Sequence, residues 1–122
     1  MRLLYIAARA PYADDRAQEL LDTLLVAASF GAQVSVLFQD DGVWQLLPGQ
    51  NGAALGRKSL GAQLEALPLF EVDHIYTDAV SLAERGLAGN DQSSKDLLLP
   101  AQALDAPALA ALLAGHDQVI RL

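Results

Sequence analysis

Residues 34–50 read VSVLFQDDGVWQLLPGQ. The first five residues of this stretch are typical of a strand that is covered on both faces. The segment that follows places Val43, Trp44, Leu46 and Leu47 where a surface loop would be polar, and Trp44 is the only tryptophan of the chain. An apolar segment that leaves the carboxyl end of a strand needs a cover, which is either the rest of this chain or another chain.

Toward the amino terminus, the sequence predicts one strand and one helix. Residues 2–9 form a short apolar run without a helical period. After Pro11, apolar residues recur with helical spacing until Gly31, at Ala17, Leu20, Leu21, Leu24, Leu25 and Ala28. Asp14 or Asp15 is expected to cap this helix, with Gln18 completing a capping box with Asp15.

Toward the carboxyl terminus, strands and helices continue to alternate. The sequence predicts a helix over 59–67, a strand over 72–79, a helical turn over 81–85 and a short strand over 97–99 that ends before Pro100. Asp105 is expected to cap a last helix that turns Leu109, Leu112 and Leu113 inward, and residues 118–122 predict a final strand. This alternation predicts an α/β protein with a parallel sheet of about five strands and helices on both faces.

The composition limits the classes of protein to consider. The 122 residues are expected to form a single domain, spanning 1–122, and the 52% hydrophobic content supports a packed core. No apolar run approaches the roughly 20 residues of a membrane span, and the amino-terminal run is too short for a signal peptide, so we expect a cytoplasmic protein. The absence of cysteine excludes disulfides, thiolate metal sites and cysteine nucleophiles. A net charge of −7 without a basic run argues against direct binding of nucleic acid.

Several polar residues suggest chemistry, but none completes a recognisable site. His74, near Asp73 and Asp78, could be drawn with Ser81 as a hydrolytic triad, yet nothing around Ser81 resembles a nucleophile elbow. Asp40 and Asp41 follow a strand and could bind Mg²⁺, yet no third ligand is evident. Residues 10–15, which lead into the first helix, lack a phosphate cradle and carry two aspartates, which disfavours a flavin or nucleotide there. We therefore predict no catalytic residue, no metal and no cofactor.

Residues 42–50, GVWQLLPGQ, resemble the signature of C-type subunits of the tRNA 2-thiouridine sulfur-relay complex, within the DsrE/DsrF-like family. The resemblance extends to LLDTLL at 20–25, SLAERGL at 81–87 and VIRL at 119–122, so that it covers most of the chain. It implies a flavodoxin-like fold. It also implies a heterohexamer with two homologous small subunits, one B-like and one D-like, in which the D-like subunit carries a persulfide-forming cysteine.

The resemblance places Asp78 at the position of that cysteine, eight residues before Gly86. Because a carboxylate cannot carry a persulfide, the resemblance implies a non-catalytic partner in the delivery of sulfur to the wobble uridine of tRNA. The segment Val43, Trp44, Gln45, Leu46, Leu47 and Pro48 is then expected to contact a sister subunit.

Three alternatives remain open at this point. The chain could be a DsrF-like subunit of a sulfur-oxidation complex, which the same resemblance covers. It could be a stand-alone flavodoxin-like protein that binds a small molecule at the carboxyl ends of its strands. Independently of these functions, the Trp44 segment could be a flap over the chain's own core.

Overall fold

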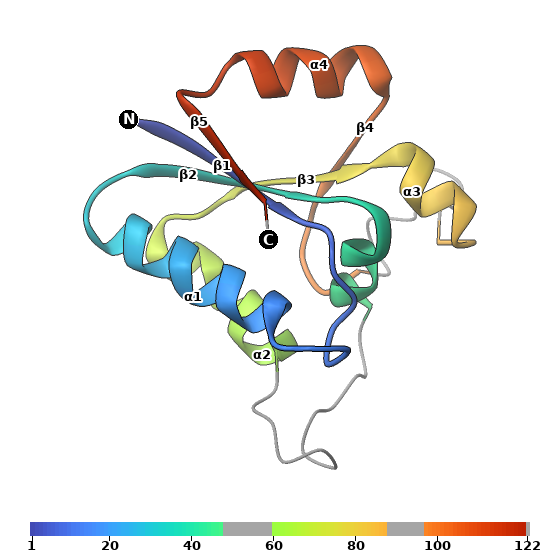
Figure 1. Cartoon of the computed structure of the whole chain (residues 1–122), viewed down its shortest axis with the longest axis horizontal. Helices are drawn as coiled ribbons and strands as arrows, with labels where there is room; N and C mark the ends of the chain where they lie inside the picture. Colours follow the sequence, from blue (N-terminus) through green and yellow to red (C-terminus); the bar gives the residue numbers. More distant parts are fainter. Residues whose placement is uncertain (48–59, 88–96, 122) are drawn as a thin grey trace.

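The computed structural model describes residues 1–47, 60–87 and 97–121. Within them, five parallel strands form one sheet in the order β4-β3-β2-β1-β5 (Figure 1). The strands are β1 (Arg2–Ala7), β2 (Gln33–Phe38), β3 (His74–Asp78), β4 (Gln102–Leu104) and β5 (Gln118–Arg121). The helices are α1 (Arg16–Ser29), α2 (Leu60–Glu65), α3 (Ala79–Glu84) and α4 (Ala106–Ala114), with 3₁₀ helices η1 (Asp40–Leu46) and η3 (Leu67–Phe70). The predicted α/β fold with helices on both faces is confirmed.

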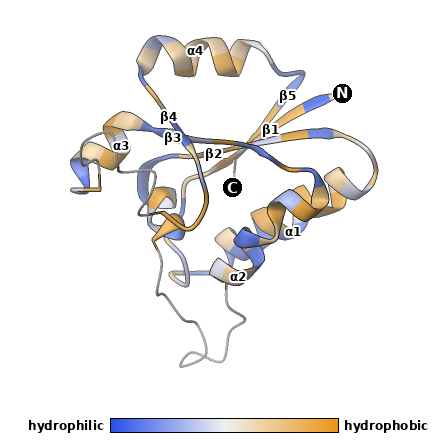
Figure 2. Ribbon diagram, turned by 180° about the vertical axis from the view of Figure 1, so that it is seen from behind, coloured by the Kyte–Doolittle hydropathy of each residue, from blue (hydrophilic) through white to orange (hydrophobic). Residues whose placement is uncertain are grey.

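The strand order explains which helix covers which face. From β1 to β4 each strand pairs with the next in sequence, so right-handed connections keep α1, α2 and η1 on one face of the sheet. The chain then crosses from β4 to β5 at the opposite edge, and this reversed direction puts α4 on the other face, where it is the one helix among the described residues (Figures 1 and 2). The chain segments that follow β3 and β4 therefore run to opposite faces of the sheet. Sheets of this kind form a crevice at the carboxyl ends of two such neighbouring strands.

Two apolar clusters, one on each face, hold the layers together. The larger one joins β1, β2 and Ile75 of β3 to α1, α2, η1 and Leu82 of α3. It contains Tyr5, whose burial raises the pKa of its hydroxyl above the ordinary value of 10.0. The smaller one contains four buried side chains, against which Tyr76, Leu109 and Leu112 pack: Leu4, Ile6, Ala8 and Leu37. The face under α4 is thus thinly covered, and no residue of α4 is fully buried.

The first helix follows the predicted pattern except at its start. Ala17, Leu20, Leu21 and Leu24 are buried, as their spacing predicted. The side chain of Asp15 makes no capping hydrogen bond, whereas Asp14 Oδ1 accepts from the backbone N–H of Arg16 at 2.9 Å. The predicted capping box with Gln18 is wrong, because the Gln18 amide instead donates to Asp22 and to Gln63 of α2, each at 2.8 Å.

The prediction of a strand over 97–99 is also wrong. Leu97 to Leu99 form bends, and the fourth strand starts three residues later, at Gln102. These leucines pack on the larger cluster, and the N–H of Leu98 donates to the carbonyl of Leu46 at 2.8 Å. A run of three leucines predicts burial equally well in a strand or in a covering loop, and here it covers η1.

The last helix departs from the prediction at two side chains. Asp105 caps it as expected, since its Oδ1 accepts from the N–H of Ala108 at 3.0 Å. Leu109 and Leu112 face the sheet, but Leu113 is 42% exposed because it lies beyond the edge of the small cluster. Within the described residues, no helix is both long enough and apolar enough to cross a membrane.

Candidate partner-binding surface and strand-end network

The 3₁₀ helix η1 packs tightly on the carboxyl end of β1. Gly42, Val43 and Leu46 are buried, and Val43 and Leu46 have no exposed surface. A Cβ atom added to Gly42 would lie 1.7 Å from the carbonyl oxygen of Ala7, so only glycine permits this approach of two backbone segments. The apolar segment noted in the sequence is therefore covered largely by the chain itself.

Gln45 ties the same helix to the turn after β1. The residue is 4% exposed, and its Nε2 donates to the carbonyl oxygen of Arg9 at 2.8 Å. This bond satisfies a buried amide and fixes the backbone at Arg9 relative to η1. Gln45 is thus an internal structural residue in the folded chain.

These positions narrow the predicted partner contact. Val43, Gln45 and Leu46 face the core, because the 3₁₀ turn directs them onto β1, and so their assignment to a contact with another chain is corrected. Trp44 and Leu47 remain partly exposed. Pro48 lies outside the described residues. A contact between η1 and a partner would accordingly centre on Trp44, with Leu47 beside it.

Asp78 is the last residue of β3 and lies at the point where the connections of β3 and β4 diverge. Its carboxylate accepts from the N–H of Val80 at 3.2 Å and from the Ser81 hydroxyl at 2.7 Å. The Ser81 Oγ in turn accepts from the N–H of Asp40 at 2.9 Å. We call this chain of contacts, formed by Asp78, Ser81 and Asp40, the strand-end network. It joins the start of α3 to the start of η1.

Asp78→Ala is expected to lower the free energy of unfolding by about 1–2 kcal/mol, the usual range for the loss of an amino-terminal helix cap. Urea unfolding of the purified chain measures this. Asp105→Ala is the matched control, because Asp105 caps α4 through one hydrogen bond at an exposed position. A smaller loss is expected there, and an Asp78→Ala loss no larger than that of the control would contradict a structural role for the network.

Asp40 and Asp41 each lie against an arginine. Asp40 Oδ2 is 2.9 Å from the guanidinium of Arg121, and Asp41 Oδ1 is 3.0 Å from that of Arg85. Asp40 has a φ of 52°, a left-handed conformation that aspartate adopts more readily than most residues. Among the described residues no group of three or more His, Cys, Asp or Glu could hold a metal ion. The two aspartates instead form ion pairs that connect the start of η1 to Arg121 and Arg85.

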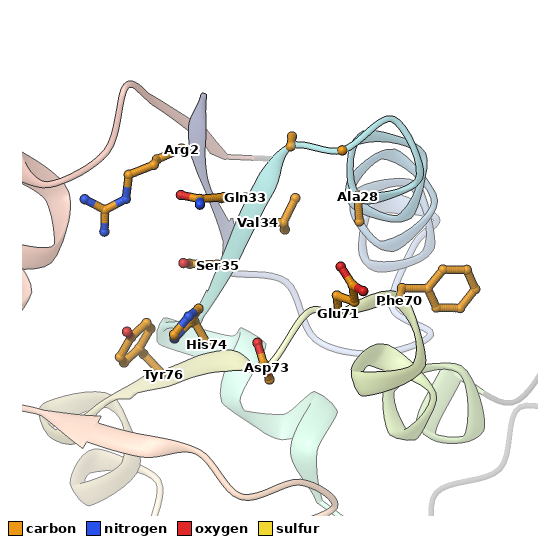
Figure 3. Close-up of a pocket in the computed structure, with 12 residues that line it drawn as sticks. Arg2, Ala28, Gln33, Val34, Ser35, Phe70, Glu71, Asp73, His74 and Tyr76 are labelled. Carbon is orange, nitrogen blue, oxygen red and sulfur yellow. The ribbon is translucent and has the colours of Figure 1, made fainter.

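A hollow of about 450 Å³ lies at the amino ends of the strands (Figure 3). Figure 3 shows Arg2, Ser35 and His74 on one side of β2, with Phe70 and Glu71 on the other. His74 opens β3 and Asp78 ends it, so the drawn triad does not assemble. The lining mixes both signs of charge and lies away from the carboxyl edge, where sheets of this class bind ligands.

His116 follows α4 and bonds to two other parts of the chain. Its Nδ1 is 2.7 Å from the carbonyl oxygen of Leu112, and its Nε2 is 3.2 Å from Ser35 Oγ. It therefore connects the end of α4 to β2 across the thinly covered face.

The fold and the strand-end network together define a doubly wound α/β domain with a carboxylate, and no thiol, at the end of its third strand. The chain belongs to the DsrE/DsrF-like family, whose model matches residues 1–122. It is 46% identical over 120 residues to a TusC homolog of Pseudomonas aeruginosa, covering 98% of this chain and 97% of that protein.

Two further comparisons bear on the family and the fold. The chain is 40% identical over 90 residues to the intracellular sulfur oxidation protein DsrF of Allochromatium vinosum, covering 74% of this chain and 66% of that protein. The crystal structure of the ychN protein from E. coli superposes with a TM-score of 0.82 at 17% identity, covering 99% of this chain and 98% of that one. The last comparison supports the fold alone.

Proposed function

We propose that this chain is a non-catalytic subunit of a cytoplasmic sulfur-relay complex that delivers persulfide sulfur for 2-thiouridine modification at the tRNA wobble position. The observation that carries the proposal is Asp78. It stands where the resemblance expects the cysteine of a sister subunit, its carboxylate is engaged by Val80 and Ser81, and the sequence contains no thiol. The likeness to a protein named TusC homolog supports the same assignment.

The proposed complex is a heterohexamer with B-like and D-like sister subunits. In it, this chain positions the cysteine-bearing subunit and contributes no bond-making group of its own. Its net charge of −7 favours contact with tRNA through other components of the relay rather than through this chain alone. The DsrF match supports one alternative, a subunit of a sulfur-oxidation complex.

Sulfur labelling of the three subunits tests the proposal. The chain alone is expected to stay unlabelled by a persulfide donor, because it has no thiolate to accept the outer sulfur as the donor thiolate leaves, whereas the co-purified D-like subunit is expected to take up label. Stable label on the isolated chain would overturn the non-catalytic assignment. Failure of the three subunits to co-purify would overturn the assignment to a complex.

Deletion of the gene separates the two kinds of relay. Loss of 2-thiouridine from bulk tRNA is the expected result, measured by mass spectrometry of nucleosides. Unchanged 2-thiouridine together with impaired oxidation of stored sulfur would favour the DsrF-like alternative.

A further inference from the structure

A groove of about 590 Å³ lies at the carboxyl edge of the sheet, on the side away from Asp78. It is formed where β1 and β5 end, beside the first turns of α1 and η1. Its lining consists of Ala8, Arg9, Arg16, Glu19, Asp40 and Arg121. We call it the arginine groove.

The arginine groove gathers positive charge in an acidic protein. The chain has 8 basic and 15 acidic residues, and three of the basic ones line this single groove. They are far apart in the sequence and form no basic run, so only the fold brings them together. The carboxyl edge of a parallel sheet is also where proteins of this architecture bind their ligands.

Of the three arginines in the groove, Arg9 and Arg16 have guanidinium groups that are available to bind a ligand. Arg121 is held by Asp40 at 2.9 Å and by Gln39 at 3.2 Å. Across the described residues, the guanidinium groups of Arg9 and Arg16 make neither an ion pair nor a side-chain hydrogen bond. Both have firmly placed backbones, since the Arg9 carbonyl accepts from Gln45 and the Arg16 N–H donates to Asp14.

The charges around the groove restrict the ligand. Glu19 and Asp40 contribute two negative charges against the three arginines, and Asp40 is paired with Arg121, so the small positive excess disfavours an extended polyanion such as nucleic acid. Asp14 already accepts the N–H of Arg16 at the start of α1, so that the arginines and not the helix end would hold an anion. A guanidinium fork matches a pair of oxygens, and two free forks match an anion with more than two oxygens and two charges.

We propose that the arginine groove binds a tetrahedral oxyanion with two negative charges, of the class of phosphate and sulfate, through Arg9 and Arg16. This site goes beyond the proposed function and does not depend on it. The ion pair between Arg121 and Asp40 forms one wall of the site and leaves the two free guanidinium groups to the ligand.

Titration of the full chain with inorganic phosphate tests the proposal by NMR, above the second pKa of phosphate and at constant ionic strength. Saturable shifts are expected for residues that line the groove, with weaker binding of acetate and no saturation by chloride. Equal affinity for acetate and phosphate would overturn the assignment to a tetrahedral dianion. An absence of saturable shifts would overturn the site itself.

Arg9→Gln and Arg2→Gln provide a matched pair of variants. Each removes one positive charge, but Arg2 lies at the opposite end of β1 from the groove. Loss of one charge-assisted contact is expected to weaken phosphate binding about tenfold or more in Arg9→Gln. Arg2→Gln is expected to leave the dissociation constant nearly unchanged. Similar weakening by both variants would show a general effect of net charge and would overturn the site.

Discussion

Gly42→Ala is expected to lower the free energy of unfolding by about 3 kcal/mol or more, since overpacking against a backbone is costlier than against side chains. The added Cβ would lie 1.7 Å from the carbonyl oxygen and 2.4 Å from the carbonyl carbon of Ala7. No rotation of a side chain can relieve this clash, because both contacting atoms belong to β1. Either η1 must lift from the strand or the strand must bend.

Urea denaturation followed by far-UV circular dichroism measures the loss. Gly61→Ala is the matched control, because among the described residues its added Cβ would meet only the tip of the Leu98 side chain, at 3.2 Å. Alanine is favoured over glycine inside a helix by about 1 kcal/mol, which offsets a small displacement of that side chain. If both variants lost the same free energy of unfolding, the contact between η1 and β1 would not be the reason that position 42 requires glycine.

Trp44→Ala is expected to weaken association with the sister subunits by about 2–4 kcal/mol, the range of a central aromatic anchor. The reason is the position of Trp44 on η1, where it stays partly exposed while Val43 and Leu46 on either side of it are buried. A large aromatic side chain in that position has apolar surface left to bury. Co-purification and a binding isotherm of the purified subunits measure the effect.

Val43→Ala is the contrasting variant. Val43 belongs to η1 and is fully buried in the core, so its truncation is expected to lower the stability of the isolated chain by about 1–3 kcal/mol while the folded chain still assembles. The core-flap alternative predicts that Trp44→Ala behaves in the same way. If Trp44→Ala destabilises the isolated chain and leaves association unchanged, the partner contact is wrong.

The sequence predicted those elements whose pattern has one physical solution. The spacing of the leucines in α1 and the apolar runs of β1 and β2 each allow a single assignment, and the structure confirms them. The run from Leu97 to Leu99 allows two assignments, because three apolar residues can be buried either in a strand or in a loop that covers another element. Here the contact with the distant η1 determines that they form a loop. The Gln18 side chain likewise donates to Asp22 and to the distant Gln63 and does not complete the predicted capping box.

The candidate site was predicted less well, for reasons of the same kind. The apolar content of η1 correctly indicates burial, but it does not say which chain provides the cover. The close contact of Gly42 with β1 shows that η1 packs on its own chain. The sequence does not reveal this contact, because a glycine in a loop can be required for many different reasons. The arginine groove depends on residues 9, 16 and 121 meeting at one edge, which requires the strand order β2-β1-β5.

That strand order also has a consequence for how the protein folds while it is being synthesised. Of the five strands, β1 is synthesised first, whereas its second neighbour, β5, is synthesised last, and the backbone N–H of Arg2 donates to Asp117 across 115 residues. Until β5 leaves the ribosome, the edge of β1 that β5 will pair with stays open. The apolar side chains of Leu4, Ile6 and Leu37 stay exposed until α4 covers them. Contacts of such long range slow folding and prolong the exposure of an unpaired edge. A nascent chain that stops before α4 is therefore the species in which chaperone binding or edge-to-edge aggregation would concentrate.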